Sequence, residues 1–398
     1  MADTSSITVQ QAFQTPFIRG VVTQFPTPDA ALQRFYGAMT NRNYVPARVF
    51  GWDQFNMTRT LGTMTAPMTD ANVIRRQKIG TKMGATLRYA EKLQIYDEEI
   101  ANLRPPGAPI GTLDARGEQW VTQQIDFLTQ RHRNLMEYAL SRCFLGGFGL
   151  AQLGQQYYIT ALNASGNAFD IDMGIPASHK NQLALGSSGE NLIDRPWDDP
   201  AADIVMVFMK LREAAIREHG WEPNHCWISS TLAGYLMQNI GLQSIAGSAN
   251  RVWNTATGEQ AQAVTPADRN LGGMSVRFNA IPWITFHVND SVVSVGSSSD
   301  PQGTDGTTVA ATTRIVPSNQ AIITPNPSSS WFTVYESGEP VQEQVNAQPV
   351  WAKGFHAFNR RMLNALAPSR EAYVLDNFLP VLVIPQAVYC PTVTGFSS

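Results

Sequence analysis

Charged residues are scarce in this sequence. Asp, Glu, Lys and Arg make up 15% of the 398 residues, against about 25% in an ordinary soluble domain. Such a surface is typical of large protein–protein interfaces, whose centres are depleted of charged residues. The net charge of −3 argues against a dedicated nucleic-acid reader, because sequence-independent affinity for nucleic acids comes from basic patches.

Cysteines and long apolar runs are also rare. Cys143, Cys226 and Cys390 lie far apart and show no metal-ligand spacing, so we expect buried free thiols in a reducing compartment. No stretch approaches the roughly 20 apolar residues of a membrane helix, and we expect no membrane partner. The N-terminus has no basic region followed by an apolar stretch, so no secretory signal is expected.

The motifs that bind phosphates, dinucleotides or zinc are missing from the sequence. It contains no G-x-x-x-x-G-K-[ST], no H-E-x-x-H and no C-x-x-C. His225 and Cys226 are adjacent on a predicted strand, where their side chains point to opposite faces, so they cannot act as a base and its nucleophile. Asp170 and Asp172 share a strand face without a companion ligand. We therefore expect no enzyme activity, no cofactor and no metal.

The longest element that the sequence predicts is a helix over residues 113–146. Apolar residues recur there at spacings of three and four, and Gly146-Gly147 ends the pattern. We expect a rod of about 45 Å, with His132 as a satisfied core histidine. The apolar face should pack on a sheet formed by residues 148–175 and 372–394. The other face should lie under a neighbour's loop or arm, and carries Gln123, Gln124, Arg131, Arg133 and Glu137.

Two segments before this helix cannot form a core of their own. Residues 1–50 scatter aromatic residues among prolines, which is typical of an arm lying in a groove. Residues 55–106 are expected to form a long two-stranded excursion, with Gly80 and Gly84 at a flexible tip and a weak period-two pattern over residues 86–95. Deleting residues 65–95 should leave a folded subunit that fails to assemble.

The remaining chain alternates strands and helices, which predicts an α+β protein. We expect strands over residues 147–176 with a hairpin loop at 163–166, and a helix capped by Asp199 that runs to Glu218. A strand at 225–229 should precede a helix capped by Ser230. Further strands are expected within 275–290, over 314–325, and as a C-terminal pair within 372–394.

Two charged clusters are candidates for contacts between subunits. The basic residues Arg75, Arg76, Lys78 and Lys82 should lie near the tip of the excursion, and the acidic residues Asp97, Glu98 and Glu99 near its base. Solvation of an exposed loop explains both clusters equally simply, and the basic residues would also suit contact with nucleic acid.

Several stretches then match a known family in their order. They are RPPG before the long helix, ALSRCFLGG at its end, and FDIDMGIP after it. WDDPAADIVMVFMKLREAAIREHGWEP, WISSTLAGYLMQN and PSNQAIITP follow. Over residues 55–390 this order resembles the tailed-bacteriophage major capsid proteins of the phage lambda E type, which have the Hong Kong 97-type capsid fold.

The resemblance implies a division of the chain. Residues 1–54 would be the N-terminal arm, and residues 55–111 the extended E-loop. The peripheral domain with its long spine helix would span 112–195, and the axial α/β domain 196–340. Residues 341–398 would return to the peripheral domain.

The resemblance also implies a function. The chain would be a major capsid protein whose pentamers and hexamers form the icosahedral virion head around double-stranded DNA, assembled in the host cytoplasm. Portal and scaffold proteins would be its partners, and residues 295–313 would be a place for a decoration protein. Some family members crosslink an E-loop lysine to a neighbour, for which Lys78 or Lys82 would serve, although lambda-type proteins are not expected to do so. An encapsulin-like cellular compartment and a soluble enzyme remain as alternatives.

Overall fold

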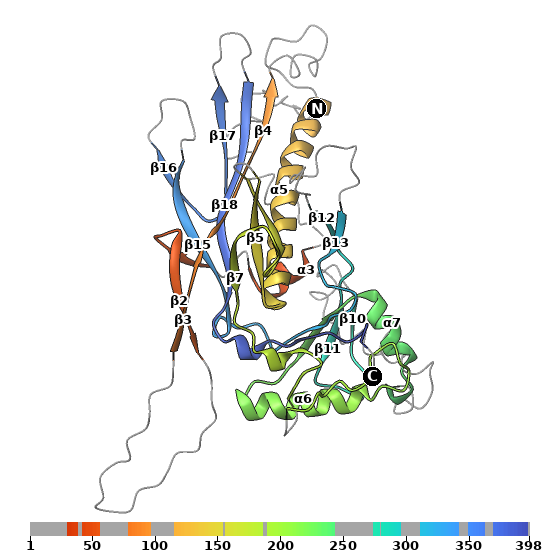
Figure 1. Ribbon diagram of the computed structural model, residues 1–398. Helices are drawn as coiled ribbons and strands as arrows, with labels where there is room; N and C mark the ends of the chain where they lie inside the picture. Colours follow the sequence, from red (N-terminus) through yellow and green to blue (C-terminus); the bar gives the residue numbers. More distant parts are fainter. Residues whose placement is uncertain are drawn as a thin grey trace, which may run out of the picture.

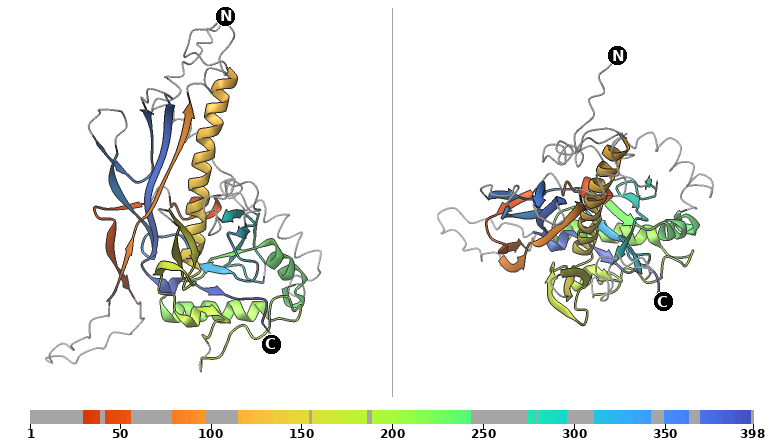
Figure 2. Two further views of the ribbon diagram at one scale, coloured as in Figure 1. Left: turned by 45° about the horizontal axis from the view of Figure 1, so that its top comes forward. Right: turned by 90° about the horizontal axis from the view of Figure 1, so that it is seen from above.

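A long helix lies along one face of a large sheet, and a compact α/β unit is joined to its lower end (Figures 1 and 2). The computed structural model describes residues 30–38, 42–55, 79–96, 115–153, 156–185, 189–242, 274–278, 280–295, 311–341, 349–362 and 369–396. Its mixture of helices and strands confirms the α+β class. No helix in these ranges is long and apolar enough to cross a membrane.

The long helix is α5 (Ala115–Phe144), which confirms the predicted rod but begins two residues later than predicted. Val121, Ile125 and His132 are completely buried on the predicted face. The helix ends before Gly146 and Gly147, whose φ angles are 111° and 130°. At Gly147 a Cβ would lie 2.2 Å from the carbonyl oxygen of Ile171, so only glycine allows this close turn into the next strand.

Strand β18 (Ser369–Leu382) is the centre of the six-stranded sheet. One edge of β18 pairs with β4 (Leu87–Tyr96), and the other pairs with β17 (His356–Met362) and β15 (Phe332–Val341). Beside β15 lie the parallel strand β1 (Arg42–Val45) and the antiparallel strand β16 (Val350–Lys353). From Val374 to Leu382 every residue of β18 is buried, the polar Asp376 and Asn377 included, so both faces of this half of the strand are covered. The weak period-two pattern predicted over residues 86–95 corresponds to strand β4.

The C-terminal strand pair was predicted wrongly. After β18 the chain passes through the short 3-10 turn η2 (Pro385–Ala387) to β19 (Cys390–Pro391). Strand β19 pairs with β8 (Lys180–Asn181), which follows η1 (Ala177–His179), and not with β18. Pro385 and Pro391 interrupt the backbone donors that a second long strand would need.

A separate three-stranded sheet follows α5, in the order β6-β5-β7. Its strands are β5 (Gly147–Leu153), β6 (Gln156–Ala161) and β7 (Asn167–Asp172). The predicted hairpin at 163–166 is therefore wrong, because β5 lies between the two strands that this loop connects. The Asn167 side chain crosses Gly149 of β5, where a Cβ would lie 1.8 Å away, and donates to the carbonyl of Ala161 on β6. Helix α5 thus packs on two sheets, where one was predicted.

The α/β unit holds a four-stranded sheet, in the order β10-β11-β9-β14. Its elements are α6 (Ile204–Glu218), β9 (His225–Ile228), α7 (Ser230–Gln238), β10 (Met274–Val276), β11 (Thr285–Val288) and β14 (Ile322–Thr324). Next to it, β12 (Val292–Val295) pairs with β13 (Ala311–Arg314). The strand predicted over 314–325 is thus the ends of β13 and β14 with a turn between them.

Both predicted helix caps in this unit were displaced. Helix α6 begins at Ile204, because Asp203 accepts a hydrogen bond from the amide of Met206 at 3.0 Å. Asp199 instead accepts from the amide of Ala201 at 2.9 Å, which holds a turn before the helix. Helix α7 is capped by Ser229, one residue before the predicted Ser230.

Candidate assembly surface

A two-stranded ribbon stands off the sheet on the side away from α5 (Figure 1). It consists of β2 (Val49–Phe55) and β3 (Ile79–Ala85), paired from Val49–Ala85 to Phe55–Ile79. Gly80 and Gly84 lie inside β3, so they do not form the predicted flexible tip. Since residues 87–96 are strand β4, a deletion of 65–95 would also remove one edge of the large sheet.

The inner face of the ribbon is fixed to its own subunit. The buried side chain of Gln54 donates to the carbonyl oxygens of Met173 (2.8 Å) and Leu382 (3.2 Å). Trp52 is buried over Gly84, where a Cβ would lie 2.9 Å from the indole. These contacts fix the direction in which the ribbon leaves the subunit.

Ion pairs join the ribbon base, the end of the ribbon at Val49 and Ala85, to the large sheet. Arg48 and Arg88 both pair with the buried carboxylate of Glu339 on β15. Although burial alone would raise the pKa of Glu339, these two guanidinium groups hold it below its usual range. Arg88 approaches to 2.9 Å. No pattern in the sequence indicated this triple, because Glu339 lies 251 residues after Arg88 and 291 residues after Arg48.

The predicted contact residues have different outcomes. Lys82 lies in β3 and pairs with Asp172 of β7 at 3.0 Å in the same subunit. Hydrogen bonds from the Gly174 amide and Lys82 lower the pKa of Asp172 despite the opposing effect of its burial. The other six residues lie outside the described ranges: Arg75, Arg76, Lys78, Asp97, Glu98 and Glu99.

The face of the ribbon opposite Trp52 and Gln54 points away from the subunit, and we call it the outer ribbon face. It is formed by Val49, Gly51, Asp53, Phe55, Ile79, Thr81, Met83 and Ala85. Residues alternate across a strand, and antiparallel partners share a face. Four large apolar side chains there are exposed, from 39% for Phe55 to 75% for Met83. Asp53 is the one charged side chain among these eight residues, and it accepts a hydrogen bond from Thr81. Sequence reasoning missed this face because Gly80 and Gly84 obscured the alternation of β3.

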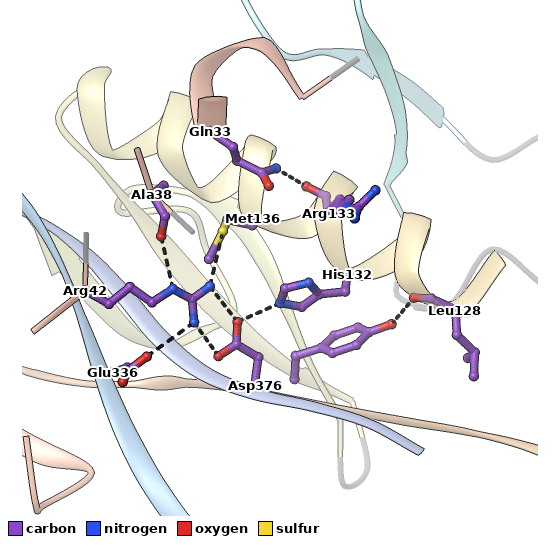
Figure 3. A network of polar contacts seen from close by, with 10 residues as sticks. Gln33, Ala38, Arg42, Leu128, His132, Arg133, Met136, Glu336 and Asp376 are labelled. Carbon is purple, nitrogen blue, oxygen red and sulfur yellow. Dashed lines mark hydrogen bonds and ion pairs between the residues drawn. The ribbon is translucent and has the colours of Figure 1, made fainter. Parts of the chain in front are cut away.

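Helix α5 is held to the sheet by a buried polar network (Figure 3). Arg42 of β1 donates to both carboxylate oxygens of Asp376 on β18, at 2.8 and 2.9 Å. Nε2 of His132 lies 2.7 Å from the same carboxylate, whereas its buried Nδ1 has no hydrogen-bond partner among the described residues. His132 is therefore a core residue as predicted, but only one of its ring nitrogens is satisfied. Burial opposes ionisation of Asp376, but its contacts with His132 and Arg42 keep its pKa below the usual value. The network joins β1, α5 and β18 at one point.

A short helix, α3 (Ala31–Phe35), connects α5 to the α/β unit. The Glu137 carboxylate accepts hydrogen bonds from the amides of Leu32 (2.7 Å) and Gln33 (3.0 Å). Complete burial raises the pKa of Glu137 to about 7. On the other side of α3, the Tyr36 hydroxyl accepts from the indole of Trp227 in β9. The predicted free face of α5 is therefore wrong at Glu137, and also at Arg131, which pairs with Glu91 of β4 at 2.8 Å.

The cysteines, which could in principle serve as nucleophiles or metal ligands, lie in the packed core. All three cysteines are buried free thiols, as predicted. Burial raises the pKa of Cys390 to about 12, and the pKa values of Cys143 and Cys226 are also raised by burial. In the described ranges, no three His, Cys, Asp or Glu side chains gather in a way that would hold a metal ion.

The chain was then compared with known proteins. No match was found among curated protein sequences. A protein described as the capsid protein of a prophage in Escherichia coli CFT073 has a similar structure, with a TM-score of 0.52 and 11% identity over 96% of this chain and 99% of that one. A phage-related protein of Bordetella bronchiseptica RB50 gives a TM-score of 0.50 and 12% identity, over 97% and 99% of the two chains. These likenesses support the Hong Kong 97-type capsid fold.

The sequence profile of one protein family covers most of the chain, from residue 18 to residue 356. The match includes α3, the ribbon, α5, the three-stranded sheet and the α/β unit. The chain belongs to the phage major capsid protein E family.

Proposed function

We propose that pentamers and hexamers of this chain form a closed shell that encloses double-stranded DNA. As a member of its family the chain is a structural protein of the icosahedral phage head and self-assembles into the capsid lattice of the virion. The shell is assembled in the host cytoplasm, and the chain has no enzyme activity of its own.

The β2–β3 ribbon is the structural feature that best supports assembly through contacts between subunits. Its inner face already contacts the rest of the same subunit, through Gln54, Trp52 and Lys82. Its outer face presents apolar side chains to the surroundings. An exposed apolar face on a projecting element is typical of a protein–protein interface. A contact between unlike surfaces of identical subunits forms a ring when the rotation from one subunit to the next closes.

The division of the chain follows the same proposal. Residues 1–54 act as the N-terminal arm, 55–111 as the E-loop, 112–195 as the peripheral domain, 196–340 as the axial domain, and 341–398 as the return to the peripheral domain. The charged residues near the E-loop that lie outside the described ranges contribute to contacts between subunits: Arg75, Arg76, Lys78, Asp97, Glu98 and Glu99. Lys82 is already paired within its own subunit.

Further partners complete the proposal. A portal protein and a separate scaffold protein take part in assembly, and a decoration protein binds the outer surface. The net charge of −3 suits an inner wall that confines DNA without sequence-specific binding. An encapsulin-like compartment is not favoured, because the matching family is one of phage capsid proteins.

Nuclease protection of native particles tests the DNA content. Particles purified from cells that produce the phage are treated with DNase before and after disruption of the shell. We expect double-stranded DNA that is resistant in the intact particle and digested after disruption. Particles that contain a protein cargo and no protected DNA would contradict the proposal.

A further inference from the structure

A row of hydrogen-bonded polar side chains crosses one face of the sheet in the α/β unit, and we call it the histidine row. It runs from Ser275 of β10 through His287 of β11 and His225 of β9 to Asn326, just after β14. The three hydrogen bonds measure 2.9, 3.0 and 2.8 Å, in that order. The central bond joins the two imidazole rings directly, from Nδ1 of His225 to Nε2 of His287.

The histidine row fits two neutral rings or one charged ring, but not two charged rings. A ring nitrogen donates only with a hydrogen and accepts only without one. With one hydrogen on each ring all three bonds are made. One additional proton is also accommodated, because Ser275 and Asn326 both offer an oxygen acceptor at the ends of the row. A second additional proton sets two N–H groups against each other across the central 3.0 Å and places two like charges side by side.

Phe35 of α3 covers the row. The centre of its ring lies 4.6 Å from that of His225 and 5.2 Å from that of His287. His287 also stacks on the ring of Trp227 at 4.5 Å and is only 4% exposed. Trp227 belongs to β9, which is paired with strands on both sides, whereas Phe35 belongs to a helix of five residues. Phe35 is therefore the cover that gives way when water has to reach a charged His287.

Helix α3 depends on its contacts for its position. A helix this short is unstable by itself in water. Towards α5 it is held by the carboxylate of Glu137, which accepts from two of its backbone amides. Towards the α/β unit it is held by Phe35 and by the hydroxyl of Tyr36, which bonds to Trp227 at 3.1 Å and to Thr324 at 2.6 Å. Loss of the contacts on one side leaves α3 attached to one part of the subunit only.

We propose that α3 is an acid-sensitive latch, which detaches from the α/β unit when both histidines of the row become charged. Displacement of Phe35 opens the row, so that water hydrates the second imidazolium. The joint between α5 and the α/β unit then loosens, while the strands of both parts stay paired. This inference concerns the single subunit and does not depend on the formation of a shell.

The charged groups around α3 determine the sign of the pH response. Burial, followed by the charges of His225 and Arg277, lowers the pKa of His287 to about 3. A hydrated histidine has a pKa of about 6.5, so release of α3 takes up a proton below about pH 6.5 and becomes more favourable as the pH falls.

Glu137 on the other side of α3 has the opposite effect. Burial raises its pKa to about 7 from the ordinary value of 4.5, although its hydrogen bonds and the charge of Arg34 in α3 act against this rise. A released Glu137 therefore loses a proton between these two pH values, and acidification opposes release there. Below about pH 4.5 the carboxyl group is protonated in both states, and His287 acts alone.

Hydrogen exchange followed by mass spectrometry tests the latch on the full-length chain. The protection of residues 30–38, relative to the unfolded chain at each pH, is measured from about pH 7 to about pH 3.5. Wild type is compared with His287→Gln, which keeps a neutral polar side chain. Glu137 is the same in both proteins, so its effect cancels. We expect the ratio of wild-type to variant protection to fall by up to about tenfold per pH unit below pH 6.5, the effect of one proton, while residues 374–382 of β18 stay protected.

His219→Gln is the matched control. His219 is also buried, and burial lowers its pKa to about 4, but it bonds to Tyr389 and to the amide of Trp221 and not to α3. This variant should keep the wild-type response of residues 30–38. A wild-type response equal to that of His287→Gln would overturn the latch.

The wild type provides a second measurement that does not require the His287 variant to fold. Below about pH 4.5, where Glu137 no longer opposes release, residues 30–38 should lose protection before residues 374–382 do. Loss of protection in both segments together would show global unfolding and would also overturn the latch.

Discussion

Gly84 determines how closely the ribbon approaches the sheet. A Cβ at this position would lie 2.9 Å from the ring of Trp52 and 3.2 Å from the side chain of Leu379. Both neighbours are buried and cannot move away freely. We expect Gly84→Ala to lower the free energy of unfolding by about 1–3 kcal/mol, the usual cost of an overpacked core, measured by denaturant titration.

Gly80 provides the matched control in the same strand. No atom lies within 4 Å of a Cβ added there, so Gly80→Ala should leave stability unchanged or raise it slightly. Equal losses for the two variants would show that steric contact with Trp52 is not what makes glycine necessary at position 84.

His287 gives the subunit a sensitivity to acid. Its Nδ1 bonds to Ser275 (2.9 Å) and its Nε2 to His225 (3.0 Å). Burial, followed by the charges of His225 and Arg277, lowers the pKa of His287 to about 3. The unfolded chain binds a proton below about pH 6.5, whereas the folded chain keeps this histidine neutral. Its contribution to stability is complete above pH 6.5 and is lost as the pH falls.

Unfolding titrations between pH 6.5 and pH 4 measure this contribution. Replacing His287 by Gln should reduce the slope of unfolding free energy against pH by up to about 1.4 kcal/mol per pH unit, the value for one proton. His219, whose pKa burial lowers to about 4, continues to contribute in the variant. An unchanged slope would mean that His287 does not stay neutral in the folded subunit.

At the scale of elements, the residues that connect β2 to β3 can be replaced while the ribbon itself stays in place. Phe55 and Ile79 are directly paired, so a short Gly-Ser linker can replace residues 58–76 without changing β2, β3 or β4. We expect this variant to keep the circular dichroism spectrum and melting temperature of a folded subunit while losing stable shells. The readouts are melting temperature and sedimentation of the assembled protein. Normal particles from a folded variant would refute the role of the replaced segment.

Elements with strong local signals were predictable from the sequence. The apolar repeat and terminal glycines fixed α5, and the apolar run from Ala372 onward indicated the strand that became β18. The caps at Asp203 and Ser229 were missed by a few residues, because nearby Asp199 and Ser230 have the same capping chemistry.

Pairings between distant segments were not predictable. Neighbouring strands in a hairpin pattern led to a wrong pairing of β6 with β7, since nothing local reveals that Asn167 crosses Gly149. Nothing in the local sequence distinguishes Glu137, Glu339 and Asp376 from ordinary polar residues. Their partners are backbone amides or guanidinium groups from distant segments of the chain.

At the scale of the whole molecule, the subunit combines rigid parts with uncovered surfaces. The Arg42–Asp376–His132 network fixes α5 on the large sheet, and Glu137 fixes α3 between α5 and the α/β unit. The ribbon base is equally fixed. Such preorganisation lowers the entropic cost of association, so each subunit enters a lattice with its contact faces already in place.

Electron microscopy of the purified full-length chain tests the central claim most directly. The account predicts closed icosahedral particles built from five- and six-membered rings, in which the ribbon of each subunit lies over a neighbouring copy. A monodisperse small oligomer that never forms closed particles under any assembly condition would contradict it.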